Sequence, residues 1–189
     1  MNSNIVNTDL LYTAPVDAKA AMNVQSISDF HGNNDELSVF KIDYKKKMNS
    51  NPKIIIVDDH SLFRETMKLL IETEGMGEVI AEAKNGKEFL DLLDVHMPDL
   101  VLMDIEMPEM DGLEATFKAL KIRPYLKILV LTMYGQKDDF VQMINAGAMG
   151  FVLKSSGKEE LEKAIKTVIG GNCYFSNEVL RKIKNSSII

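Results

Sequence analysis

The sequence predicts an α/β fold in which helices cover both faces of one parallel β-sheet. From Lys53 onward, short runs rich in Ile, Val and Leu alternate with stretches whose apolar residues recur at helical spacing, as in successive βαβ units. Hydrophobic residues make up 46% and charged residues 26% of the chain, which is ordinary for a globular domain. Its 189 residues leave room for one domain of about 100 to 150 residues plus additional sequence.

Five strands are expected, each short enough to be buried on both faces of a parallel sheet. They span residues 54–57, 79–83, 100–103, 128–131 and 151–153. A helix follows each strand. In the first helix we expect Ser61 to supply the N-cap, and we expect Met67 and Ile71 to lie on the apolar face.

The later helices have recognisable beginnings and ends. Gly112 opens the third helix, in which we expect Leu113, Phe117 and Leu120 to face inward. Gly147 follows the fourth helix and suits the left-handed conformation that often ends a helix. These signals give five successive βα units.

Composition and repetition divide the chain into three regions. Residues 1–47 show no sustained helical or strand period, and the opening tetrapeptide Met-Asn-Ser-Asn recurs at residues 48–51. We therefore expect residues 1–47 to be an N-terminal extension, either flexible or fused to the domain. Residues 48–171 are the expected domain, and residues 172–189 a linker or short helix.

Charge and cysteine content exclude several classes of protein. A net charge of -6 disfavours a domain whose whole surface grips nucleic-acid phosphates. The single cysteine, Cys173, cannot form an internal disulfide. No stretch approaches the roughly 18 apolar residues that span a bilayer, and no secretion signal opens the chain. We expect a cytoplasmic protein with no membrane contact.

Polar residues follow four of the expected strands. Asp58 and Asp59 follow the first strand, Asp104 the third, Thr132 the fourth and Lys154 the fifth. Right-handed crossovers bring the carboxyl ends of parallel strands to one edge, where such folds bind ligands. These five side chains are therefore expected to converge on one site.

The expected convergence suits magnesium and phosphoryl chemistry. Three neighbouring carboxylates raise one another's pKa unless a cation neutralises them, and Mg²⁺ prefers oxygen ligands. An aspartate such as Asp104 can attack phosphorus and form an acyl phosphate. The ammonium of Lys154 and the hydroxyl of Thr132 would then stabilise the transferred group.

Four segments together resemble the signatures of response-regulator receiver domains of two-component systems. They are Ile55–His60, Leu102–Gly112, Leu131-Thr132 and Gly150–Lys154. The resemblance runs from about residue 53 to residue 170. It implies a doubly wound, five-stranded parallel sheet of strand order 2-1-3-4-5, the flavodoxin-like arrangement of CheY-like proteins.

The resemblance also implies a role for each site residue. Asp104 would accept a phosphoryl group from a phosphohistidine on a sensor histidine kinase. Asp59 and Asp104 would bind Mg²⁺ directly, together with the backbone carbonyl of Glu106, and Asp58 would assist, often through water. Such a chain is a phosphoacceptor signalling domain and not an enzyme, because it catalyses only its own phosphorylation and dephosphorylation.

A conformational switch is implied as well. In the family, the residue matched by Thr132 moves toward the phosphoryl group and the aromatic residue matched by Phe151 turns inward. This changes the face formed by helix 4, strand 5 and helix 5, and can lead to a homodimer. Phe151 lacks the hydroxyl that a tyrosine would offer.

The end of the chain is similar to one subfamily of receivers. Ser155 stands where many receivers have proline, and the tail Ile169–Ser176 resembles receivers of the LuxR, NarL and FixJ type, which are joined to a helix-turn-helix DNA-binding domain. Only 18 residues follow Gly171, too few for such a domain. We expect either the receiver part of a transcription regulator, with DNA contacted only through the missing domain, or a stand-alone receiver.

Other interpretations start from the same residues. The pair Asp58-Asp59, taken alone, is more often a loop or helix-capping feature than a metal site. An aspartyl-phosphate phosphatase also uses a strand-end aspartate with magnesium, but usually carries a DxDxT pattern, whereas Asp104 is followed by Ile105 and Glu106. A module that binds partners without phosphorylation is a further alternative. The joint placement of five residues favours the receiver.

Overall fold

Six parallel strands form the sheet of this protein. The computed structural model describes residues 51–133 and 137–185. The strands, in chain order, are β1 Lys53–Val57, β2 Glu78–Ala83, β3 Leu100–Met103, β4 Ile128–Thr132, β5 Gly150–Leu153 and β6 Tyr174–Phe175. In the sheet they lie in the order β2-β1-β3-β4-β5-β6. Every neighbouring pair is parallel, which confirms the predicted parallel α/β architecture.

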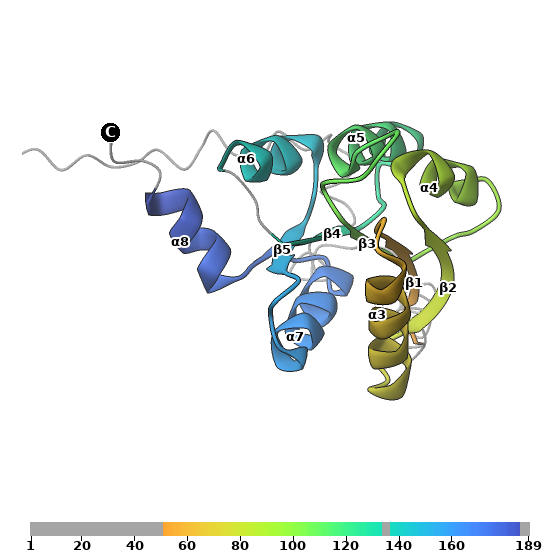
Figure 1. Cartoon of the computed structure of the whole chain (residues 1–189), viewed down its shortest axis with the longest axis horizontal. Coiled ribbons are helices and arrows are strands. Elements are labelled where there is room, and N and C mark those ends of the chain that lie inside the picture. Colours follow the sequence, from red (N-terminus) through yellow and green to blue (C-terminus); the bar gives the residue numbers. More distant parts are fainter. Residues whose placement is uncertain (1–50, 134–136, 186–189) are drawn as a thin grey trace, which may run out of the picture. The chain divides into compact units, whose positions relative to one another are not determined.

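Helices alternate with these strands and cover both faces of the sheet. They are α3 Ser61–Thr73, α4 Gly86–Leu93, α5 Gly112–Ile122, α6 Lys137–Ala146, α7 Lys158–Ile169 and α8 Asn177–Asn185. Helices α4, α5 and α6 lie on one face and α3 and α7 on the other (Figure 1). Since parallel strands joined by helices must cross over the sheet, this two-faced arrangement follows from the βα alternation.

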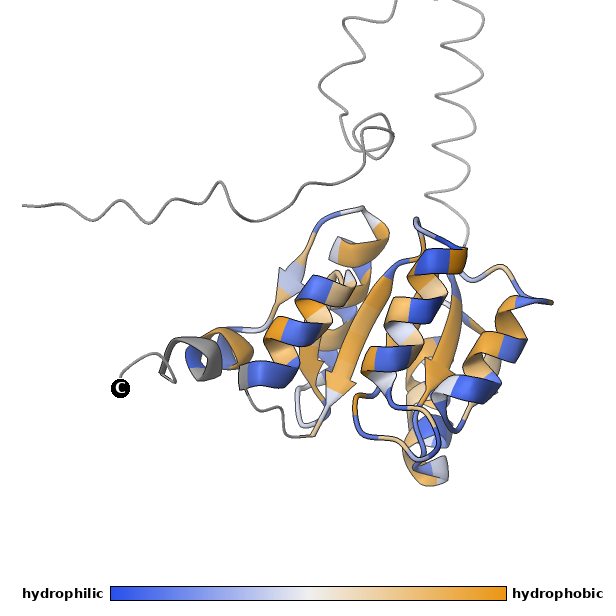
Figure 2. Cartoon of the chain, turned by 90° about the horizontal axis from the view of Figure 1, so that it is seen from above, coloured by the Kyte–Doolittle hydropathy of each residue, from blue (hydrophilic) through white to orange (hydrophobic). Residues whose placement is uncertain are grey.

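Successive residues of each strand supply two separate cores. In β1, Ile55 and Val57 pack toward α4, α5 and α6, whereas Ile54 and Ile56 pack toward α3 and α7, as the period-2 geometry of a strand requires. The central strands β3, β4 and β5 are buried along their whole length, while the helices are hydrophobic on one side (Figure 2). Both faces of the central sheet are therefore closed to water, whereas the edge strand β2 carries Glu82, which is paired with Arg64 and Lys68.

The sixth strand corrects the predicted five-stranded sheet. Gly171, with φ of 86°, turns the chain back beside β5, where Gly150 pairs with Tyr174 and Phe151 with Phe175. Two residues are too few to show a strand period in the sequence, so this region looked like a linker. Helix α8 follows, and its Val179 is fully buried in the α4–α6 core.

Two helical details were also predicted wrongly. Phe117 is 52% exposed, because α5 turns Ala115, Thr116 and Ala119 toward the core. Ser61 is the first residue of α3 and not its N-cap, which is His60 and makes no side-chain capping bond. The side chain of Asp58 accepts the His60 N–H at 2.9 Å. This bond fixes the backbone at His60, so the N-cap lies one residue before the predicted Ser61.

Two sequence expectations concern the N-terminal extension and the membrane. The predicted extension, residues 1–47, lies outside the described residues. Within residues 51–133 and 137–185, no helix has the length and apolar character needed to cross a membrane.

Candidate functional site

The carboxyl edge of the sheet gathers the predicted polar residues. Asp58 and Asp59 follow β1, Asp104 follows β3, Thr132 ends β4 and Lys154 follows β5. The strands β1, β3, β4 and β5 are adjacent. The parallel topology therefore brings together residues that lie far apart in the sequence, at the edge where open α/β sheets bind ligands.

Lys154 joins the carboxylates of two strands. Its Nζ lies 2.5 Å from Asp58 Oδ2 and 2.6 Å from Asp104 Oδ2. The side chains of Lys154, Asp58 and Asp104 are only 3%, 2% and 6% exposed. The ammonium also lies 4.8 Å from the centre of the Phe63 ring, a distance at which a cation is attracted to the ring face. This buried ion cluster is the electrostatic centre of the site.

Burial raises the pKa of the Asp104 carboxyl above its ordinary value, and the neighbouring carboxylate of Asp58 adds to the rise. The ammonium of Lys154 opposes both effects by a hydrogen bond and by its charge. The backbone N–H of Ile105 also donates to Asp104 Oδ1, at 2.8 Å. Asp104 is thus a carboxylate held in a dry environment by one ammonium and one amide.

The donor set fits a hard divalent cation. Oxygen atoms of Asp58, Asp59 and Asp104 and one nitrogen of His60 all lie within 4.8 Å of one another. Three carboxylates against the one ammonium of Lys154 leave two negative charges, which a divalent cation would balance. Carboxylate oxygens, one of them partly open to solvent, are the ligands that Mg²⁺ prefers while it keeps several waters.

The role predicted for the Glu106 backbone carbonyl is to bind Mg²⁺. Glu106 lies in the loop that follows β3, and its side chain is exposed. This role stays a prediction.

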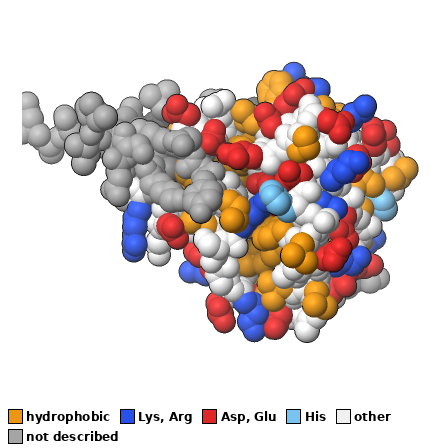
Figure 3. Space-filling view, in the orientation of Figure 1, with side chains coloured by type: hydrophobic (Ala, Val, Ile, Leu, Met, Phe, Trp, Pro, Cys, Tyr) orange, Lys and Arg blue, Asp and Glu red, His pale blue; other side chains and the backbone are white. Residues whose placement is uncertain are grey.

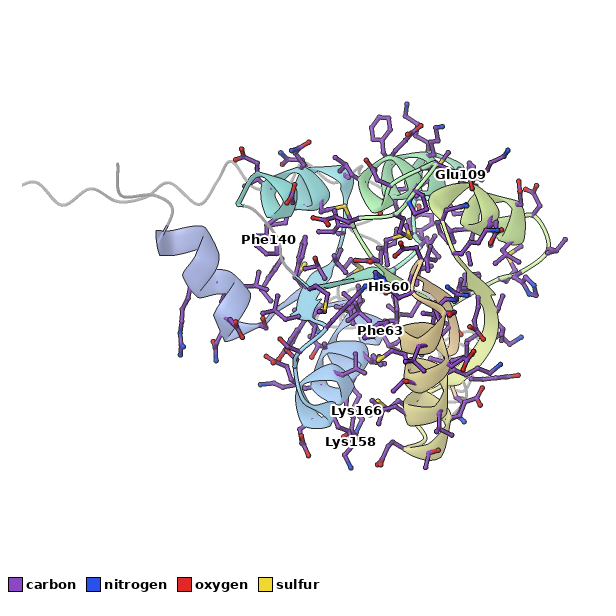
Figure 4. The ribbon with its side chains drawn as sticks, viewed as in Figure 1. His60, Phe63, Glu109, Phe140, Lys158 and Lys166 are labelled. Atoms are coloured by element: carbon purple, nitrogen blue, oxygen red, sulfur yellow. The ribbon has the colours of Figure 1, made fainter. Side chains whose placement is uncertain are left out.

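His60 is a neighbour of the site that the sequence interpretation quoted but assigned no role. Its Nδ1 lies 2.8 Å from Asp59 Oδ1 and 3.3 Å from Asp58 Oδ1, while the side chain is 70% exposed. Figure 3 shows acidic side chains gathered on this face, and Figure 4 labels His60 close to Phe63 at one end of α3. Its position directly after an acid pair was the available signal.

Thr132 and Phe151 lie on the side of the site toward β5. Thr132 is 2% exposed, and its backbone carbonyl accepts the N–H of Lys154 at 2.8 Å. Phe151 is fully buried between two rings: Phe140 of α6, with centres 5.2 Å apart and edge to face, and Phe175 of β6, stacked at 5.9 Å. The Phe151 side chain therefore points from β5 into the core beneath α4, α5 and α6.

Asn85 reaches the loop that follows Asp104 and was absent from the sequence interpretation. This side chain, 1% exposed, caps α4 by accepting the Glu88 N–H and also donates to Glu109. An asparagine followed three residues later by glutamate is a signature of a helix start, so the cap could have been predicted. The contact with Glu109, 24 residues away, could not.

Comparison with known proteins agrees with this geometry. Residues 54–166 match the family model described as the response regulator receiver domain. The transcriptional regulatory protein YdfI of Bacillus subtilis is 40% identical over 70% of this chain and 62% of that protein. The response regulator GacA of Pseudomonas aeruginosa is 36% identical over 69% of this chain and 61% of that protein. This chain therefore spans less than two thirds of these relatives.

Solved structures give the same result. A two-component response regulator of the LuxR family from Aurantimonas sp. SI85-9A1 superposes with a TM-score of 0.69 at 33% identity, over 74% of this chain and 100% of that one. A CheY-like receiver domain protein from Methanospirillum hungatei JF-1 gives a TM-score of 0.60 at 32% identity, over 65% and 96%. The chain belongs to the response regulator receiver domain family, and the Aurantimonas protein that it resembles is a regulator of the LuxR family.

Proposed function

We propose that Asp104 accepts a phosphoryl group from the phosphohistidine of a sensor histidine kinase, in a reaction that requires Mg²⁺. The observation that carries this proposal is the contact of Lys154 Nζ with both Asp104 and Asp58, at 2.6 and 2.5 Å, in a pocket where all three side chains are buried. A buried ammonium beside an ionised aspartate offers both a nucleophile and a charge that can stabilise the transferred group.

The transfer moves one phosphoryl group between two side chains. An Asp104 oxygen forms a bond to phosphorus as the bond from phosphorus to the kinase imidazole breaks, and the electron pair of that bond returns to the imidazole, which can take a proton. Lys154 then faces a phosphoryl oxygen as well as a carboxylate. Its ammonium offsets part of the added negative charge, and the Thr132 hydroxyl is the group we assign to a second phosphoryl oxygen.

The residues proposed to hold Mg²⁺ are Asp58, Asp59, Asp104 and the backbone carbonyl of Glu106. The cation would supply positive charge to the phosphoryl oxygens. Asp59 is suited to direct coordination, because its side chain is 32% exposed and can keep part of its hydration. Asp58 is 2% exposed and already paired with Lys154, which suits an indirect role.

We propose that phosphorylation is read out through Thr132 and Phe151 at the face formed by α6, β5 and α7. The output would be transcription, as in the regulators that this chain resembles, with DNA bound by a separate output domain. A homodimer formed on phosphorylation is part of the same proposal. The chain would be a signalling domain whose own chemistry is limited to gaining and losing its phosphoryl group.

The test is phosphorylation of the protein by a small phosphoryl donor with Mg²⁺, followed by intact mass, for wild type, Asp104→Asn and Asp91→Asn. Asp91 is an exposed residue of α4, so its substitution controls for the loss of one carboxylate. We expect one phosphoryl group on wild type and Asp91→Asn and none on Asp104→Asn. Equal modification of all three proteins would remove Asp104 from the role, and turnover of the donor without accumulation of phosphorylated wild-type protein would indicate a phosphatase.

A further inference from the structure

The loop of residues 105–111 folds back against the backbone of Asp104. The Gly112 N–H donates to the Ile105 carbonyl at 2.9 Å. A Cβ at Gly112 would lie 1.9 Å from the carbonyl oxygen of Asp104, so only glycine allows this approach. Both ends of the loop therefore lie next to the backbone of Asp104, the proposed phosphoryl acceptor, and Glu106 lies within the loop.

The middle of this loop is held in a disfavoured conformation. Glu109 has φ of 65°, in the left-handed region that residues with a Cβ rarely occupy. Just beyond it, the Met110 N–H donates to the Pro108 carbonyl at 2.7 Å. Such a conformation persists only where surrounding contacts determine it.

The start of α4 supplies those contacts. Asn85 Nδ2 donates to Glu109 Oε1 at 3.0 Å, and Asn85 Oδ1 accepts from the Glu88 N–H at 2.8 Å. The next residue, Gly86, donates its N–H to the Met110 carbonyl at 2.9 Å. Figure 4 labels Glu109, which lies between α4 and α5 in that view.

Asparagine is the residue that can make both bonds. Its oxygen faces an N–H donor and its NH₂ faces a carboxylate, so the two partners fix the orientation of the amide. Aspartate and serine also cap helices well, but an ionised aspartate has no proton to give to Glu109, and the serine side chain is shorter. The cap alone does not require an amide here; the contact with the loop does.

We infer that Asn85 is a positioning residue of the site: by holding Glu109, it fixes loop 105–111 and the Glu106 carbonyl where Mg²⁺ binds. This inference rests on the proposed function, which assigns that carbonyl to the cation. Asn85 touches neither the cation nor the phosphoryl group. Substitution of residues that hold metal ligands in place without touching the metal typically lowers metal affinity about 10- to 100-fold.

The test exchanges the donor and the acceptor of one hydrogen bond. Asn85→Asp keeps the helix cap but sets two carboxylates against each other. Glu109→Gln alone keeps an oxygen that can accept the hydrogen bond from Asn85. Combined with Asn85→Asp, it supplies an NH₂ group that can donate to the new aspartate, so the hydrogen bond is restored in the opposite direction. We expect Asn85→Asp to weaken Mg²⁺ binding about tenfold, Glu109→Gln to change it little, and the double variant to recover most of the affinity.

Two further measurements separate positioning from general destabilisation. Ser176→Ala removes the cap of α8, where Ser176 Oγ accepts the Val179 N–H at 3.2 Å, far along the sheet from the loop. We expect it to lower the midpoint of thermal unfolding without changing the Mg²⁺ affinity. Hydrogen exchange of the amides of residues 105–111, without Mg²⁺, should be faster in Asn85→Asp than in wild type.

Three results would overturn the inference. They are unchanged Mg²⁺ affinity in Asn85→Asp, a loss that Glu109→Gln does not reverse, or a loss that Ser176→Ala reproduces at equal destabilisation. A wild-type protein that binds no Mg²⁺ would instead contradict the proposed function, while the exchange rates would still report whether Asn85 holds the loop. Failure of the inference and failure of the function are thus distinguishable.

Discussion

The two sides of the buried ion cluster of Asp58, Asp104 and Lys154 are built from different interactions. Toward β1 and α4, directed polar bonds hold the backbone: the amide of Asn85 holds Glu109, and the carboxylate of Asp58 holds the N–H of His60. Toward β5 and β6, stacked and edge-to-face rings fill the space, with Phe151 between its two aromatic neighbours. Lys154 lies between the two sides, next to both carboxylates.

This difference suits two different tasks. A hydrogen bond weakens steeply when its distance or angle changes, so the polar side suits the task of keeping the proposed Mg²⁺ ligands at fixed positions. Apolar packing is not directional, so the aromatic side can exchange one arrangement for another without leaving polar groups unsatisfied. We therefore expect substitutions on the aromatic side to change stability, and substitutions on the polar side to change binding.

The largest effect is expected on the aromatic side. Phe151→Ala removes a fully buried ring and should lower the free energy of unfolding by about 4 kcal/mol, while Mg²⁺ affinity stays close to that of wild type. Phe117→Ala is the matched control, because Phe117 is 52% exposed, and should change stability by less than about 1 kcal/mol. Denaturant unfolding and Mg²⁺ titration measure both quantities; similar losses in the two variants would contradict the assignment of Phe151 to the core.

Lys154→Ala is expected to act on both properties. It leaves two buried carboxylates without their cation and should lower the free energy of unfolding by about 3 kcal/mol in Mg²⁺-free buffer, with the fold retained and phosphorylation-dependent switching impaired. Added Mg²⁺ should recover part of the stability, because it replaces the lost positive charge. Lys158→Ala, whose Nζ pairs with Glu74 at 3.1 Å on the surface, should change stability by less than about 1 kcal/mol. No recovery with Mg²⁺ would count against the shared site.

A comparison of the long and short strands shows how much of the fold the sequence could predict. The β1 and β3 strands are apolar runs that are buried on both faces, so composition alone located them. The β6 strand has only Tyr174 and Phe175, and its existence depends on pairing with β5. Phe117 was predicted to face inward because it is apolar, but small residues of α5 fit the close packing against the core better.

For the site, the strand ends were predictable and the loops were not. Asp58, Asp104 and Lys154 converge because parallel strands end at one edge, a rule that needs only the strand order. The contact of Asn85 with Glu109 depends on a left-handed residue in an irregular loop, whose backbone no sequence period reveals. The roles of Thr132, Phe151 and the Glu106 carbonyl come from the family resemblance and await the experiments above.

Mg²⁺ binding on the polar side should depend on pH. Burial raises the pKa of Asp104, so the carboxyl holds its proton to a higher pH than an ordinary aspartate, whose pKa is about 4. Mg²⁺ binds the ionised carboxylate. As the pH decreases, the Mg²⁺ affinity should therefore begin to fall at a higher pH than for a site built on an ordinary aspartate. Below the pKa of the site, the affinity should fall by about tenfold per pH unit. Titrations between pH 7.5 and 4.5 test this, and a constant affinity over that range would contradict it.

The smallest effect concerns Cys173, two residues before Phe175. Although the residue is exposed, partial burial of its sulfur raises the pKa of the thiol. Since the thiolate is the reactive form, alkylation by iodoacetamide at pH 7.5 should be slower than for free cysteine and should rise with pH; unfolded protein is the control.

The alkylation rate also reports which side of the site a substitution disturbs. Phe151→Leu keeps an apolar side chain but loses the ring that stacks on Phe175, so it should loosen β6 and speed the alkylation of Cys173. Asn85→Asp acts on the other side of Lys154 and should leave that rate unchanged. Equal acceleration by both variants would mean that the polar and aromatic sides form one cooperative unit.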